Sequence, residues 1–285
     1  MEIEHIAAFS KEEDGGNPAG VALLEHAASV AEMARVAAQV GYSETVFAYP
    51  LHDGTGAWRV RYFAPEAEVP FCGHATIALG AVLGMNFGAG TYPLVLNASE
   101  IEVEAEISGP RMKATLSSPP TKSRPTDEME LRQTLDLLGL SLEDLDGRLP
   151  PARIHAGADH IALTLLDRTR LAAMRYDLGK GREMMRRLGL VTIMLVHAEN
   201  DRTFVARNAF ASGGVVEDPA TGAAAAAFAG YLRDLGWPHG GHITIRQGED
   251  MRVPCLIEVR LADTPGSSVH VSGQTRFIQA ASRSA

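Results

Sequence analysis

The chain of 285 residues has little of what marks several classes of protein. Its two cysteines, Cys72 and Cys255, are too few for a disulfide framework. It has 26 basic residues against 35 acidic ones, and the net charge of −9 argues against nucleic acid or an anionic membrane as a partner. No apolar run reaches the roughly 18 residues of a membrane span, and no secretory signal is evident. These features favour a cytoplasmic, reduced globular protein.

The sequence GGVVEDPATG at residues 213–222 leads directly into a segment that has no polar stripe before Arg233. A segment that is apolar on every side predicts a buried helix. Asp218 is a favoured N-cap residue and Pro219 suits a first helical position, so the pattern predicts a helix that begins there. A buried helix start aims N–H groups and the positive end of the helix dipole into the protein, which makes an anion site. Alternatively, Asp218 is only a cap.

The first half of the chain has the same pattern. Residues 63–76 run from Phe-Ala-Pro to Gly-His-Ala-Thr, and an all-apolar helix candidate follows over 77–84. We infer an internal duplication of roughly 120 to 150 residues, far longer than a solenoid repeat. Short turns join most predicted strands, which favours antiparallel sheets. The expected fold is α+β, with two similar lobes, each an antiparallel β-barrel-like sheet around a central buried helix.

Residues 117–121 (SSPPT) are the best linker candidate and divide the chain at residue 117. Two lobes that face each other would place both helix starts at a shared cleft. Clefts between domains are where small-molecule sites usually lie. We therefore expect a small-molecule substrate at such a cleft.

Three side chains in the first half are candidates for chemistry. Glu44 interrupts an apolar strand candidate at 42–49, and burial would make such a carboxylate a better general base; alternatively it points to solvent. His74 lies near the first helix start, where it could carry a proton or bind an oxyanion; alternatively it is a capping or core histidine. Cys72 could be reactive, because a helix N-terminus favours a thiolate. A cysteine beside a phenylalanine is more often simply buried.

Cofactor motifs are not evident in the sequence. The ten histidines are scattered, and His239 and His242 have no third ligand nearby, so no metal is expected. A Walker loop, GxGxxG and GxSxG are all missing, which gives no sign of a cofactor. The sequence thus offers one candidate acid/base and two helix starts that could hold an anion. This combination suits proton abstraction next to a carboxylate or carbonyl, because oriented N–H groups stabilise the enolate-like charge that develops. Isomerisation is the simplest interpretation.

Four segments together resemble the PhzF family of phenazine-biosynthesis isomerases, within the diaminopimelate epimerase-like fold. They are Gly16-Asn17-Pro18 with Val21, residues 43–47 (SETVF), residues 61–76 (RYFAP to CGHAT) and residues 217–222 (EDPATG). The resemblance implies an N-terminal lobe of 1–117, to which 268–285 returns, and a C-terminal lobe of 118–267. It also implies a homodimer that needs neither metal nor organic cofactor.

The resemblance further implies roles for individual residues. Glu44 would be the acid/base that moves a proton on a cyclic dihydro-hydroxyanthranilate-like acid, and His74 and Asp218 would bind, orient and assist. The implied substrate-binding positions are Asn17, Gly73, Ala75, Thr76, Thr221, Gly222 and Ala223.

The sequence departs from the family pattern at Ala223, where phenazine isomerases have a serine after Thr-Gly. The missing hydroxyl argues against the phenazine precursor as the substrate. Epimerases of this fold use one thiol on each face of the substrate carbon; Cys72 falls near the first position, but Pro219 falls near the second. The alternatives are an epimerase or racemase that uses Cys72, paired with Asp218 or Glu44, and a non-catalytic small-molecule binding protein on the same fold.

Overall fold

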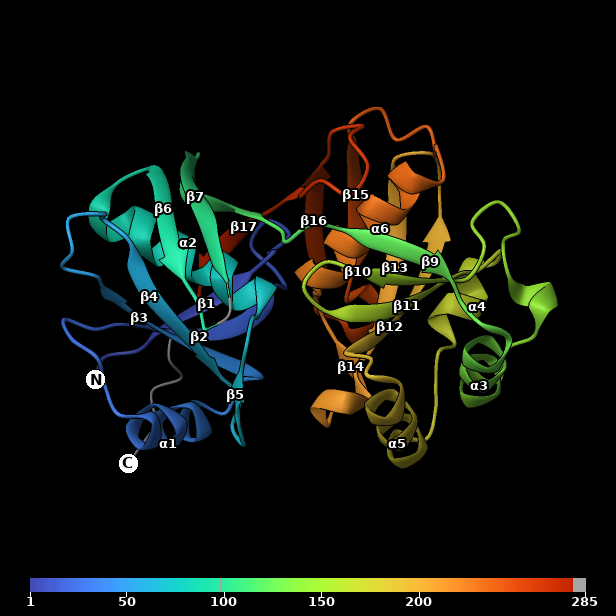
Figure 1. The fold of residues 1–285 in the computed structure, drawn as a ribbon, viewed down its shortest axis with the longest axis horizontal. Coiled ribbons are helices and arrows are strands. Elements are labelled where there is room, and N and C mark those ends of the chain that lie inside the picture. The colour runs from blue at the N-terminus through green and yellow to red at the C-terminus, as the bar shows by residue number, and fades with distance from the viewer. Residues whose placement is uncertain (98, 279–285) are drawn as a thin grey trace. The chain divides into compact units, whose positions relative to one another are not determined.

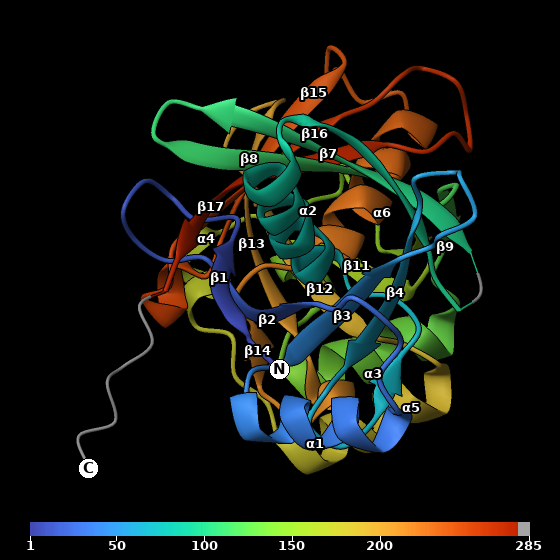
Figure 2. The same cartoon turned by 90° about the vertical axis from the view of Figure 1, so that its left-hand side faces the viewer.

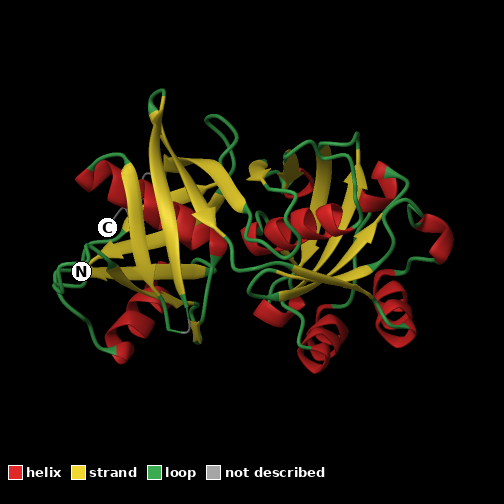
Figure 3. Cartoon of the chain, turned by 45° about the horizontal axis from the view of Figure 1, so that its top comes forward, coloured by secondary structure: helices red, strands yellow, loops and turns green. Residues whose placement is uncertain are grey.

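The computed structural model describes residues 1–97 and 99–278. The chain divides into two compact units, one of residues 1–117 and 272–285, the other of residues 118–271. No helix within the described residues is long and apolar enough to cross a membrane. In each unit, strands surround a helix that is buried along most of its length (Figure 3).

The first unit is a closed barrel. Its strands are β1 (Glu4–Ala8), β2 (Asn17–Leu23), β3 (Glu44–Pro50), β4 (Trp58–Phe63), β6 (Gly90–Val95), β7 (Glu100–Ser108), β8 (Arg111–Ser117) and β17 (His270–Phe277). They pair in that order, and β17 closes the ring because it pairs with both β8 and β1. Most neighbours are antiparallel, but β2–β3 and β4–β6 are parallel, so the sheet is mixed. The short β5 (Glu68–Val69) extends β4.

Helix α2 (Gly73–Phe87) is enclosed by these strands (Figure 1, Figure 2), and every residue from Gly73 to Gly84 is buried. Its uniformly apolar sequence accounts for this position, because no face of the helix needs water. Gly80 lets the helix approach β7: a Cβ there would lie 2.5 Å from Val103 Cγ2. Outside the barrel lies α1 (Val30–Val40), which has Ser29 as its N-cap and Gly41 as its C-cap.

The second unit repeats this plan. Its strands pair in the order β9 (Lys122–Pro125), β10 (Ala152–His155), β11 (Asp159–Thr164), β12 (Thr192–Ala198), β13 (Thr203–Ala209), β15 (His242–Gln247) and β16 (Cys255–Arg260). The short β14 (Glu217–Asp218) extends β13. Helix α6 (Gly222–Asp234) is the buried one, and α3 (Glu128–Leu138), α4 (Arg168–Ala172) and α5 (Leu178–Leu188) cover the other face of the sheet.

The duplication expected from the sequence is visible in the strand registers. Each unit has two pairs of parallel strands. In the first pair of each unit (β2–β3 and β11–β12), helices other than the buried one connect the strands. In the second pair (β4–β6 and β13–β15), the connection contains the buried helix. An ion pair occupies the same place in each unit: Arg61–Glu68 between β4 and β5, and the buried Arg207–Glu217 between β13 and β14. The predicted α+β fold with two similar lobes is therefore confirmed.

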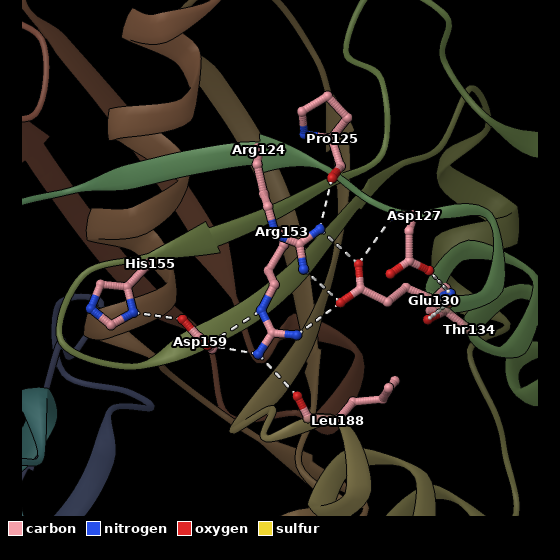
Figure 4. A network of polar contacts seen from close by, with 9 residues as sticks. All are labelled: Arg124, Pro125, Asp127, Glu130, Thr134, Arg153, His155, Asp159 and Leu188. Atoms are coloured by element: carbon pink, nitrogen blue, oxygen red, sulfur yellow. Dashed lines mark hydrogen bonds and ion pairs between the residues drawn. The ribbon is translucent and has the colours of Figure 1, made fainter.

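A charged network in the second unit joins α3 to β9, β10 and α5 (Figure 4). The buried Glu130 accepts hydrogen bonds from Arg124, from Arg153 and from the Asp127 amide. Arg153 also donates to Asp159 and to the carbonyl of Leu188, at the end of α5. One carboxylate thus holds the start of a helix against two strands.

One local prediction was wrong. Asp218 does not cap α6; it lies in β14, and the N-cap is Thr221, so Pro219 precedes the helix instead of opening it. Pairing of Asp218 with Asn208 of β13 overrides the local signal for a helix start.

Candidate active site

Glu44, Cys72 and His74 form a buried cluster in the first unit. Their exposed fractions are 8%, 9% and 5%. The distance from His74 Nε2 to Glu44 Oε2 is 3.4 Å, and Cys72 Sγ lies 3.3 Å from His74 Nδ1. The imidazole therefore lies within reach of both a carboxylate and a thiol.

Two rigid elements place these side chains. Glu44 is the first residue of β3, beside Ala19 of β2, and His74 is the second residue of α2. The structure buries Glu44, so the alternative that this side chain points to solvent is wrong. Its Oε2 atom is buried and accepts no hydrogen bond from any residue that the structure describes. A buried carboxylate oxygen without a donor is costly, and such positions are typical of functional sites.

Hydroxyl groups surround the cluster. Ser43 Oγ lies 3.4 Å from His74 Nε2. Thr76 donates its hydroxyl proton to the carbonyl of Cys72 over 2.7 Å, so the hydroxyl of Tyr62 is the donor in its 2.7 Å contact with Thr76 Oγ1. Burial raises the pKa of Tyr62, which keeps this phenol protonated. The Thr76 hydroxyl thus holds the first turn of α2 in place.

The start of α2 also offers backbone donors. Within the described part of the chain, the amides of Gly73, His74 and Ala75 have no acceptor, as first-turn amides of a helix usually lack one. All three residues are buried. Together with the helix dipole they make a site suited to an anion beside the imidazole of His74.

The second unit has a corresponding helix start. Asp218 Oδ2 accepts the hydroxyl proton of Thr221 over 2.6 Å, and both residues are buried. Gln247 Nε2 donates to the Asp218 carbonyl, and Gln247 Oε1 accepts from the Thr221 amide. The amides of Gly222 and Ala223 have no acceptor among the residues described. Gln247 could not be predicted as a site residue, because it lies 26 residues beyond Thr221 and has no motif around it.

A row of buried polar side chains also crosses this sheet. His160 Nδ1 lies 2.7 Å from Thr192 Oγ1, and Thr192 donates to Asn208 Oδ1 over 3.0 Å. Burial lowers the pKa of His160 to about 3, so its ring is neutral. Asn208 is the register partner of Asp218 across β13 and β14. This row could not be predicted from the sequence, because its three members lie on three different strands.

Comparison with known proteins identifies the family. The family model described as phenazine biosynthesis-like protein matches residues 6–280. This chain belongs to that family. A Deinococcus radiodurans protein named an uncharacterized isomerase is 34% identical over 278 residues, which cover 94% of this chain and 90% of that protein. The resemblance inferred from the sequence is thus confirmed, and the chain is an isomerase of the phenazine biosynthesis-like family.

Solved structures agree with this assignment. The structure of a predicted epimerase from Pseudomonas aeruginosa has a TM-score of 0.84 and 25% identity, and the match covers 99% of both chains. A phenazine biosynthesis protein of the PhzF family from Bacillus anthracis also has a TM-score of 0.84, with 18% identity and 98% of both chains covered. The second likeness concerns the fold alone.

The predicted site residues of this phenazine biosynthesis-like protein form two clusters, one in each unit. The first unit brings Glu44, Gly73, His74, Ala75 and Thr76 together around the start of α2, and Asn17 is buried at the start of β2. The second unit brings Asp218, Thr221, Gly222 and Ala223 together around the start of α6.

Proposed function

We propose that the protein is a cofactor-independent isomerase that moves a proton between carbons of a small, cyclic or amino-acid-derived carboxylic acid. Glu44 is the general acid/base. The observation that carries the proposal is the position of Glu44 Oε2, which is buried, accepts no hydrogen bond from the described residues and lies 3.4 Å from His74 Nε2. Such a carboxylate has a lone pair available for a carbon-bound proton.

The surroundings of Glu44 support a single proton-transfer mechanism. Glu44 removes a proton from the carbon next to a carboxylate or carbonyl, and negative charge develops on the substrate oxygen. The amides of Gly73, His74 and Ala75 stabilise that charge without reorganisation, because the helix already orients them. Glu44, now protonated, returns its proton to a different carbon, and the imidazole of His74 orients the carboxyl group. Isomerisation then consumes no other reagent.

The second unit supports a role in substrate binding. We propose that Asp218 binds and orients the substrate, with its carboxylate held by the hydroxyl of Thr221. The amides of Gly222 and Ala223 would hold a carboxylate or carbonyl of the substrate, as the helix start is suited to an anion. Since Ala223 has no hydroxyl, we propose a substrate other than the phenazine precursor.

Deuterium exchange tests the assignment of the base. The purified chain is incubated in D₂O with mixtures of small carboxylic acids, including a dihydro-hydroxyanthranilate, and NMR detects incorporation. General acid–base catalysis contributes about 10²- to 10⁴-fold, so Glu44→Gln is expected to lower the exchange rate by about 100-fold or more. Glu102→Gln, at an exposed position of β7, is the matched control and keeps the wild-type rate. Equal rates in Glu44→Gln and the control would show that Glu44 is not the base.

A second candidate function is epimerisation with Cys72 as one of two bases. It is favoured by the 3.3 Å distance between Cys72 Sγ and His74 Nδ1, since an imidazole can activate a thiol. Mild alkylation would then abolish the activity of the wild type and of Cys255→Ser, because both keep the thiol of Cys72. Any activity that remains in Cys72→Ser would survive alkylation. Full activity after alkylation of Cys72 would exclude this candidate. If neither exchange nor epimerisation occurs with a broad set of acids, a non-catalytic binding role gains support.

We also propose that the protein is a homodimer, as the family resemblance implies. Light scattering after size exclusion would then give twice the chain mass of 30.4 kDa. A mass of one chain at micromolar concentration would contradict the proposal.

A further inference from the structure

We propose that Glu44, Cys72 and His74 form a binding site for Zn²⁺ or a similar thiolate-binding divalent cation. Each residue offers one ligand atom, and the three atoms lie within 4.8 Å of one another. One oxygen, one nitrogen and one sulfur ligand are the donor types that Zn²⁺ takes from proteins. The sequence alone predicts no metal, because its histidines are scattered and His239 and His242 have no third ligand nearby.

Two of the three separations between ligand atoms lie near those expected around a tetrahedral ion. With ordinary Zn²⁺ bond lengths, a nitrogen and an oxygen ligand lie about 3.4 Å apart, and a sulfur and a nitrogen about 3.6 Å apart. His74 Nε2 lies 3.4 Å from Glu44 Oε2 and 3.9 Å from Cys72 Sγ. The sulfur lies closer to Nδ1, at 3.3 Å, so the imidazole has to turn for Nε2 to face both partners. Three protein ligands leave a fourth position open.

The ligands would also match the charge of the ion. Metal binding takes the carboxylate of Glu44 and the thiolate of Cys72, two negative groups at buried positions, and buried charges are costly unless they are compensated. Zn²⁺ compensates both at once and supplies a partner for Glu44 Oε2, which accepts no hydrogen bond in the described part of the protein. Glu44 lies in β3, and Cys72 and His74 lie at the start of α2, so only the imidazole has to reorient when the ion binds.

The ligand set predicts which cations bind. Mg²⁺ and Ca²⁺ require about six or more oxygen ligands, and this cluster supplies one carboxylate. Zn²⁺ binds imidazole and thiolate well, and Co²⁺ takes the same ligands with lower affinity. Bound Zn²⁺ would occupy the lone pair that the proposed reaction needs, so it would inhibit turnover. That consequence rests on the proposed function, whereas the binding itself does not.

Cobalt absorption tests the site directly. The full chain is freed of metal with a chelator and titrated with Co²⁺, and the expected result is a thiolate-to-cobalt charge-transfer band that saturates at one equivalent. Zn²⁺ added afterwards abolishes the band by displacing Co²⁺, and calorimetry gives its affinity; Mg²⁺ leaves the band unchanged. A chain that develops no such band would overturn the proposal.

Three variants make the test specific. Cys72→Ser is expected to lose the band, and Cys255→Ser, which alters a buried thiol outside the cluster, keeps it. Loss of an outer-sphere partner already lowers metal affinity by about 10- to 100-fold, so Glu44→Gln, which removes a ligand, should weaken Zn²⁺ binding by at least 10-fold. Zn²⁺ binding with wild-type affinity in Cys72→Ser or Glu44→Gln would place the metal on other histidines and refute the site.

The two proposals fail independently. Cobalt absorption and calorimetry require no substrate, so a failed metal site leaves the deuterium-exchange result for Glu44 unaffected. Conversely, a chain without exchange activity can still show the cobalt band.

Discussion

Replacing Glu130 by glutamine is expected to destabilise the protein by an amount that depends on pH. Burial alone would raise the pKa of Glu130, but the hydrogen bonds from Arg124, from the Asp127 amide and from Arg153 lower it from an ordinary 4.5 to about 2. One pKa unit corresponds to about 1.4 kcal/mol, so the charged form contributes about 3 kcal/mol to stability at pH 7. Glutamine keeps the shape of the side chain and removes its charge.

The sign of the pH dependence follows from the lowered pKa. Above the unfolded pKa of about 4.5 the contribution is fully present, and it is lost as the pH falls toward the folded pKa of about 2. The stability difference between the wild type and Glu130→Gln should therefore be about 3 kcal/mol at pH 7 and about 2 kcal/mol smaller at pH 3. The other carboxylates are present in both proteins, so their contributions to the pH dependence of stability cancel in the difference between the wild type and Glu130→Gln.

Urea denaturation followed by circular dichroism measures this difference at several pH values. Glu128→Gln is the matched control: Glu128 lies in the first turn of the same helix and is exposed, so its loss should cost about 0.5 kcal/mol or less. If Glu130→Gln costs no more than this control, or costs the same at pH 3 as at pH 7, the reasoning is refuted.

Two further substitutions test the interior of each unit by the same denaturation assay. Thr192→Val leaves two buried polar atoms without their hydrogen-bond partner, so it is expected to lower the free energy of unfolding by about 2 to 4 kcal/mol. The control Thr244→Val, at a half-exposed position of β15, should change it by less than about 0.5 kcal/mol. A loss below about 1 kcal/mol for Thr192→Val would show that the row is not a stabilising network. Gly80→Ala brings a Cβ to 2.5 Å from Val103 Cγ2 and should cost about 1 to 3 kcal/mol, while Gly90→Ala meets open space and should be near neutral. Equal stabilities of the two alanine variants would contradict the tight packing of α2.

The buried helices could be predicted from the sequence because they have an unmistakable pattern. Residues 77–84 and 223–232 are apolar on every side, and only a helix enclosed by other elements satisfies such a sequence. The start of the second buried helix was predicted wrongly, because a local helix signal competed there with strand pairing. Asp218 and Pro219 have the chemistry of a helix start, but pairing with Asn208 holds Asp218 in a strand, and the helix begins later, at Gly222.

The candidate site was predictable in part for the same reason. Glu44 could be selected because a carboxylate in an apolar strand is conspicuous, and His74 because it adjoins a helix start. Gln247 and Asn208 could not be selected, since nothing in their own segments distinguishes them from ordinary strand residues. Asn208 meets Thr192 because β12 and β13 are neighbours in the sheet, and Gln247 meets Thr221, the N-cap of α6, across 26 residues of the chain.

The sequence by itself determined the α+β class, the duplication and the family, because these depend on periodicity and on motifs that local residues carry. Only the tertiary structure decided which side chains meet. Burial of Glu44 against His74 depends on where β3 lies relative to the first turn of α2. That placement is set by packing of a whole barrel around one helix, and no short segment of the chain encodes it.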